Sequence, residues 1–134
     1  MSEIKSNVEQ INNSADVIYA FLSNLNNFKE LMPDQIENWK STEDTCSFRI
    51  KNMVDLSLRL TEKVPCSLIV LSPEGKAPFN FSLRCMLEKV EENKTNAIIM
   101  FKADLNPMME MLAKSPLQNL VNILVSKLKQ KFDQ

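Results

Sequence analysis

The sequence contains no histidine, and this absence limits the chemistry that the chain can perform. Without histidine there is no usual general base at neutral pH, no Ser-His or Cys-His nucleophile pair, and most zinc sites are excluded. The three cysteines, Cys46, Cys66 and Cys85, form no CxxC pair, and their odd number argues against a disulfide framework. We expect them to be reduced, buried thiols that act as small hydrophobic side chains. The sequence therefore predicts no metal site and no cofactor, and it marks out no catalytic residue.

An excess of charge of one sign and long apolar runs are also missing. The 16 basic and 17 acidic residues leave a net charge of −1, so there is no basic field to hold nucleic acid. The longest apolar runs, residues 68–71 and 97–101, are far too short to span a membrane. Residues 1–10 carry three charges and lack the apolar centre of a signal peptide. These features predict a cytoplasmic protein with a single domain over residues 1–134, without a membrane span or a nucleic-acid partner.

The beginning of the chain has the pattern of one strand followed by two short helical stretches. Residues 3–12 carry apolar side chains among polar ones with an imperfect period, which predicts a first strand. Ser14 is a suitable N-cap for a helix over residues 14–25, whose apolar residues recur at helical spacing. A second helical stretch over residues 28–32 is ended by Pro33, because proline cannot continue a helix.

Between residues 36 and 103 the apolar side chains alternate with the period of two that is typical of β-strands. The only glycine, Gly75, follows a proline in a short polar segment, which indicates a hairpin turn. Residues 68–71 are apolar without alternation, which predicts a strand that is buried on both faces. The predicted strands cover Ile36–Ser41 and residues 46–50, 56–60, 66–71, 79–87 and 97–103.

The alternation also predicts how the second and third of these strands pair. A turn centred on residue 53 places Ile50 opposite Leu56, so that apolar side chains share one face of the sheet. The same register sets Lys51 opposite Asp55, which joins opposite charges on the other face. Apolar parity and charge therefore agree on one pairing.

A long amphipathic helix is predicted over Pro107–Phe132. Asn106 is placed as its N-cap, and Pro107 occupies the first helical position, where proline is favoured. Because Pro116 removes a backbone hydrogen bond, we expect either a kink or a second helical segment capped by Ser115. A lone amphipathic helix after a series of strands buries its apolar side against the concave face of the sheet. This arrangement predicts a space between the helix and the sheet.

This order of elements resembles the helix-grip fold of the START-related superfamily, also called SRPBCC, which includes polyketide cyclases and lipid-transfer domains. The resemblance is carried by the two helical stretches after Ser14, by the strand that contains Trp39, and by Asn106 and Pro107 opening the long helix. It implies an α+β fold in which a curved antiparallel sheet of about seven strands wraps around a long C-terminal helix. The implied order is one strand, two helices, six strands and a helix. The similarity extends to small bacterial members without assigned activity, and it carries over no catalytic residues because the superfamily has none in common.

The resemblance also implies a cavity between the sheet and the terminal helix that often holds an apolar or amphipathic small molecule. A solid core is the alternative, because protein interiors are close-packed, whereas the methionines favour an adaptable lining. Tyr19, Trp39 and Asp104 are candidate polar groups of the cavity, although the roles of half-buried aromatics and of a charge near a helix cap are favoured over this one. By parity and spacing the lining residues are Phe48, Ile50, Leu56, Leu58, Leu60, Phe79, Phe81 and Leu83 from the strands, and Met108, Met111, Leu112, Leu120 and Leu124 from the helix.

Three classes of function remain open at this point. The first is non-catalytic binding of a small hydrophobic or amphipathic molecule, such as a lipid, in this cavity. The second is a protein-interaction or regulatory module, motivated by residues 68–71, with a homodimer as its simplest form. Superfamily members associated with chaperones and ribosomes keep this class open. The third, an enzyme of the cyclase or dehydrase type, needs a polar group in the cavity, and no such group is marked out by spacing.

Overall fold

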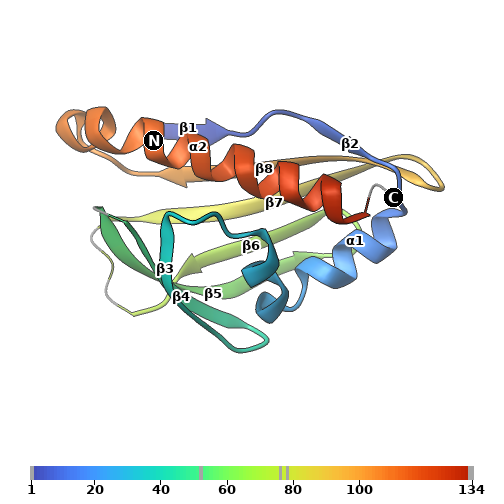
Figure 1. Ribbon diagram of the computed structural model, residues 1–134, viewed down its shortest axis with the longest axis horizontal. Helices are drawn as coiled ribbons and strands as arrows, with labels where there is room; N and C mark the ends of the chain where they lie inside the picture. Colours follow the sequence, from blue (N-terminus) through green and yellow to red (C-terminus); the bar gives the residue numbers. More distant parts are fainter. Residues whose placement is uncertain (1, 52, 76, 78, 133–134) are drawn as a thin grey trace.

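The computed structural model describes residues 2–51, 53–75, 77 and 79–132. Over these residues it confirms the α+β prediction, with an antiparallel sheet of eight strands, an α-helix and a 3-10 helix near the start, and a long helix at the end (Figure 1). The strands are β1 (Ser2–Lys5), β2 (Glu9–Ile11), β3 (Ile36–Ser41), β4 (Thr45–Ile50), β5 (Val54–Val64), β6 (Leu68–Pro73), β7 (Phe81–Glu91) and β8 (Lys94–Ala103), and the helices are α1 (Ala15–Leu22), η1 (Leu25–Leu31) and α2 (Pro107–Phe132).

The sheet has the order β1-β8-β7-β6-β5-β4-β3, and β2 also pairs with β8. The strand predicted over residues 3–12 is therefore two short strands. The break falls at Ser6, whose backbone N–H donates to the carbonyl of Ile99 at 2.9 Å while its Oγ accepts from the Ile99 N–H. A side-chain oxygen thus replaces a backbone partner at this point, which explains the imperfect period of the segment.

One edge of the sheet is formed by β3, and this strand is irregular. Its pairing with β4 shifts between Glu37 and Lys40, which is the position of a β-bulge. Asn38 lies within the bulge and adopts a left-handed backbone conformation with φ of 56°. Asparagine is one of the few residues that accept this conformation at low cost.

Both α-helices, α1 and α2, are capped at their N-termini as the sequence predicts. The Oγ atom of Ser14 accepts a hydrogen bond from the backbone N–H of Val17 at 3.3 Å. The Oδ1 atom of Asn106 accepts from the backbone N–H of Met109 at 2.8 Å. Each bond satisfies a donor that has no partner within its helix.

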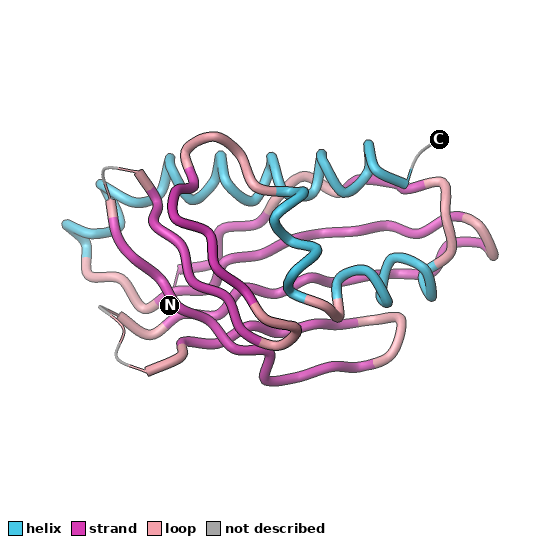
Figure 2. The backbone as a smooth tube through the Cα atoms, turned by 60° about the horizontal axis from the view of Figure 1, so that its bottom comes forward, coloured by secondary structure: helices cyan, strands magenta, loops and turns pink. Residues whose placement is uncertain are grey.

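Helix α2 lies across the concave face of the sheet and contacts β1, β2, β8 and η1 (Figures 1 and 2). It continues through Pro116 as one helix, so a second segment capped by Ser115 does not form. Its buried residues repeat at intervals of three and four, which is the stripe of an amphipathic helix. No helix in the described part of the chain is long and apolar enough to cross a membrane. The buried stripe consists of Ala113, Leu117, Leu120, Val121, Leu124, Val125 and Leu128.

Strands β4 and β5 pair two residues away from the predicted register. The predicted pairing of Ile50 with Leu56 is wrong, because the turn between the strands is centred one residue earlier than expected, which pairs Ile50 with Val54. Arg49 takes the place predicted for Lys51 opposite Asp55, and its Nη1 atom lies 3.3 Å from both carboxylate oxygens. A shift of two residues preserves the parity of a strand, so the same side chains still face the interior.

Candidate ligand-binding site

Most of the side chains that parity predicted to line a cavity belong to, or pack against, the hydrophobic core of the protein. These side chains are buried, or partly buried against the hydrophobic core, and they pack closely enough to occupy much of the space. Those from the sheet side are Phe48, Ile50, Leu56, Leu58, Leu60, Phe79, Phe81 and Leu83, and those from α2 are Leu120 and Leu124.

The first two turns of α2 do not follow this pattern. Met108, Met111 and Leu112 are 73%, 85% and 73% exposed, so they do not face the sheet as predicted. The buried stripe of α2 instead extends from Leu117 back through Ala113, which places these three residues on the opposite side of the helix. We refer to Met108, Met111 and Leu112 as the apolar start of α2.

Aromatic side chains gather near the same end of the molecule. The rings of Phe81 and Phe101 stack with centroids 5.3 Å apart, and Phe79 lies 5.5 Å from Phe81. On the facing strands, Trp39 stacks on Phe48 at 5.6 Å. Figure 1 shows the start of α2, the end of β4 and the start of β7 at one end of the molecule. The sequence does not single out Phe101, because residues 97–101 are all apolar and show no alternation that would mark the inner face.

The three polar candidates do not form a common site. Tyr19 lies on α1, at the opposite end of the molecule from Asp104, which is exposed just before α2 (Figure 1). Trp39 is partly buried, and its Nε1–H donates to Ser41 Oγ at 3.2 Å. The Ser41 hydroxyl in turn donates to the Oδ1 atom of Asn26 at 2.7 Å. These distances give no paired acid and base in the interior.

Cys46 and Cys85 are buried, as the sequence predicts, whereas Cys66 is not. Burial raises the pKa of the Cys46 and Cys85 thiols to about 12, so both stay neutral at physiological pH. Cys66 is partly exposed, and its thiol donates to Asp16 Oδ1 at 2.6 Å. This hydrogen bond to a carboxylate raises the pKa of the Cys66 thiol and makes it a poor nucleophile. Among the described residues, no three metal-binding side chains lie close enough together to hold an ion.

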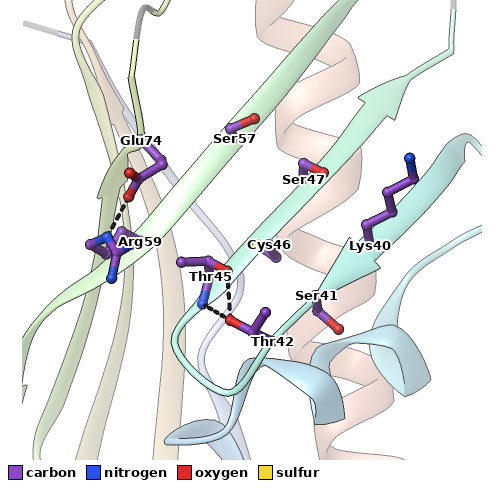
Figure 3. Close-up of a pocket in the computed structure, with 9 residues that line it drawn as sticks. All are labelled: Lys40, Ser41, Thr42, Thr45, Cys46, Ser47, Ser57, Arg59 and Glu74. Atoms are coloured by element: carbon purple, nitrogen blue, oxygen red, sulfur yellow. Dashed lines mark hydrogen bonds and ion pairs between the residues drawn. The ribbon is translucent and has the colours of Figure 1, made fainter.

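The larger pockets open on the outside of the molecule. One groove of about 370 Å3 lies along β3, β4 and β5, where Arg59 is paired with both Glu74 and Asp44 (Figure 3). A second pocket, of about 440 Å3, lies between α2 and the segment that joins β1 to β2. Of the predicted lining residues, Phe48 and Leu56 touch a smaller pocket of about 160 Å3 and Leu60 touches another of about 370 Å3.

Comparisons with known proteins identify the fold. No protein-family model matches the sequence, and no curated protein matches it. Among solved structures, the protein XoxI from Bacillus cereus is 15% identical with a TM-score of 0.76, covering 98% of this chain and 96% of its own. A START superfamily protein from Mycobacterium smegmatis is 12% identical with a TM-score of 0.70, covering 98% and 97%. The Aha1 dimer from Colwellia psychrerythraea is 19% identical with a TM-score of 0.65, covering 99% and 97%.

The chain therefore has a START-like, helix-grip fold, as its sequence resemblance implied. The similarity spans nearly the whole of each chain, so it includes both the curved sheet and the helix that crosses it. At these levels of identity the comparison establishes the arrangement of the backbone. The chemistry of the interior depends on the side chains of this protein, which the shared fold does not determine.

Proposed function

We propose that this protein binds a small hydrophobic or amphipathic molecule, without catalysis, between the sheet and α2. The molecule enters at the end where α2 begins. The observation that carries the proposal is the apolar start of α2, which lies at the same end as the stacked aromatic rings. The START-like fold supports the proposal, because it sets a long helix across a concave apolar surface.

The apolar start of α2 is costly for a surface that faces only water. Burying one methionine or leucine side chain contributes about 1.5–3 kcal/mol relative to leaving it exposed. Met108, Met111 and Leu112 forgo that contribution in the unbound protein, since each is more than two-thirds exposed. Because these side chains lie on the side of α2 away from the sheet, they would be covered by the outer end of the ligand, emerging at the entry and lying over the first turns of α2. The flexible methionine thioethers adapt readily to its shape.

The packed interior determines how a ligand is accommodated. The side chains beneath α2 are close to fully buried, so a ligand has to displace them rather than fill an existing void. Phe48 stacks on Trp39, and Phe81 stacks on Phe101 and contacts Phe79. Rotation of the Phe48 and Phe81 rings would lengthen the site from its mouth inward.

The single tryptophan provides the test. Trp39 stacks on Phe48 at the proposed entry, so a ligand there will change its fluorescence. We would titrate the native protein with dodecanol and dodecanoate, an uncharged and an anionic probe of equal length, and follow Trp39 emission. Saturable binding is expected. No change in emission, together with no binding by calorimetry, would contradict the proposal.

Two variants test whether the proposed binding site borders α2. Replacing both Met111 and Leu112 with glutamate should weaken binding at least about tenfold, because two apolar contacts are lost and charge is introduced. Asn119→Glu is the matched control, since Asn119 is exposed on the same helix but outside its apolar start. Equal affinities for all three proteins would show that α2 does not border the entry.

A homodimer is the second candidate. The Aha1 protein from Colwellia psychrerythraea is described as a dimer, and it shares the fold of this chain. The near-neutral charge of this protein adds support, because a net charge of −1 opposes self-association only weakly. Sedimentation velocity over a range of concentrations tests for the dimer directly.

A further inference from the structure

The outer face of the sheet carries a row of apolar side chains that no described part of the chain covers. Val64 pairs with Leu68, Leu68 with Met86, and Met86 with Ile98, so the four lie side by side across β5, β6, β7 and β8. Val64 is 41% exposed and the other three are partly exposed. We call these four residues the outer apolar row.

A second set of apolar side chains lies next to the outer apolar row. Val70 and Met100 flank Arg84 on the same outer face, and they are only 4% and 7% exposed although neither belongs to the interior core. A sheet with one solvated face normally alternates apolar and polar residues. That alternation fails over adjacent strands here, which accounts for the unbroken apolar sequence of β6. Such a face is typical of a surface that packs against another protein.

A positively charged residue lies on one side of the outer apolar row, and a negatively charged residue lies on the other side. On β7, Arg84 lies two residues before Met86, and Glu88 lies two residues after it. Arg84 Nε donates to Ser82 Oγ at 3.4 Å, and Glu88 Oε1 accepts from Asn96 Nδ2 at 3.3 Å. Neither forms an ion pair within the described part of the chain, so both charges are available to a partner.

We propose that the outer apolar row is the interface of a homodimer, with the two-fold axis lying in the interface across the strands at Met86. This inference rests on the homodimer named above and assigns its surface. Such an axis reverses the strand direction in the partner, so the apolar row stacks on its own copy. The same operation places Glu88 of one subunit over Arg84 of the other, twice. The face is therefore complementary to itself in both polarity and charge.

The size of the proposed interface determines the affinity that we expect for the dimer. Stable interfaces bury about 800 Å2 on each partner, and the four side chains of the outer apolar row offer less than that, because Val70 and Met100 are already buried within the subunit. We therefore expect a weak dimer with a dissociation constant on the order of micromolar to millimolar. Sedimentation velocity over that concentration range is the suitable measurement.

A charge exchange tests the assigned surface. Arg84→Glu and Glu88→Arg each place like charges opposite one another, so each should weaken the dimer at least about tenfold. The double variant carrying both exchanges restores opposite charges and should recover most of the affinity. Lys40→Glu, on the polar part of the outer face, is the control and should leave the dimer unchanged. Circular dichroism confirms that each variant is folded.

The outcomes separate the two proposals. A native protein that stays monomeric over the whole range overturns the homodimer and the assigned surface together. A native dimer that tolerates both single exchanges overturns the surface alone, as does a double variant that fails to recover. Met86→Lys places a charge on the proposed axis and provides a second test, since it should abolish the dimer. Dimerisation that survives this change as well contradicts the assignment.

Discussion

The two parts of α2 both carry apolar side chains, but these side chains lie in opposite environments. The later part, from Ala113 onward, packs on the sheet, and its last turns are tied down by side chains. Lys127 Nζ donates to the carbonyl of Met32 at 3.2 Å, and Lys131 Nζ lies 2.9 Å from Glu30 Oε1. The apolar start of α2 is held by its N-cap and projects into solvent. One part of the helix therefore stabilises the fold, and the other remains available for contact.

Truncating a leucine in each part should give the largest difference. Leu124 is fully buried, so Leu124→Ala should lower the free energy of unfolding by about 2–5 kcal/mol. Leu112 is exposed, and Leu112→Ala should change it by less than about 0.5 kcal/mol. Urea denaturation of both variants measures the difference. Equal losses would show that the start of α2 packs on the protein in solution.

Hydrogen exchange should divide the helix at the same place. Amides of residues 117–128 lie in the packed part and should exchange only through large-scale opening, whereas those of residues 110–112 open locally. We expect a difference in protection of about a hundredfold, which corresponds to about 2.7 kcal/mol. Uniform protection along α2 would remove the distinction between its two parts.

Pro116 lies near the beginning of the packed part of the helix, and its replacement should couple the two parts more strongly. Proline inside a helix costs up to about 3 kcal/mol relative to alanine, since a backbone hydrogen bond is lost. Pro116→Ala should therefore raise the free energy of unfolding and slow exchange of the amides before it. Ser115→Ala is the control for a neighbouring change that restores no bond. A destabilised Pro116→Ala protein would mean that the proline is required by its packing.

The smallest effect is expected at the end of α2. Lys131 pairs with Glu30 and lies 5.1 Å from the ring centroid of Phe21. Because the pair is largely exposed, Lys131→Ala should lower stability by only about 0.5–1 kcal/mol. A double-mutant cycle with Glu30→Ala isolates the ionic part of this contribution. A coupling energy near zero would assign the whole effect to the aromatic contact.

The sequence predicted the inner face of the sheet better than the pairing of its strands. Parity alone identifies Phe48, Leu56 and Leu58 as inward residues, and a register error of two residues leaves that parity intact. The correct register depends on the residue at which the turn is centred, which the alternation does not reveal. The contact between Trp39 and Phe48 was also beyond prediction, because it depends on the bulge in β3.

Among the candidate lining residues of α2, only some were correctly predicted to be buried. Leu120 and Leu124 belong to a long stripe whose direction is unambiguous over several turns. Met108, Met111 and Leu112 also recur at helical spacing, but they form a short second stripe on another side of α2. Spacing shows that residues share a face, whereas contact with the sheet shows which face is buried.

The bulge in β3 has a consequence for how these molecules can associate. A regular outermost strand offers a row of free backbone donors and acceptors onto which another chain can add, and repeated addition produces fibrils. The left-handed turn of the backbone at Asn38 interrupts that row in the middle of the strand. Growth of a continuous intermolecular sheet is blocked on this side. Substituting Asn38 with valine, which disfavours the left-handed conformation and promotes regular strands, should make the protein more prone to aggregate.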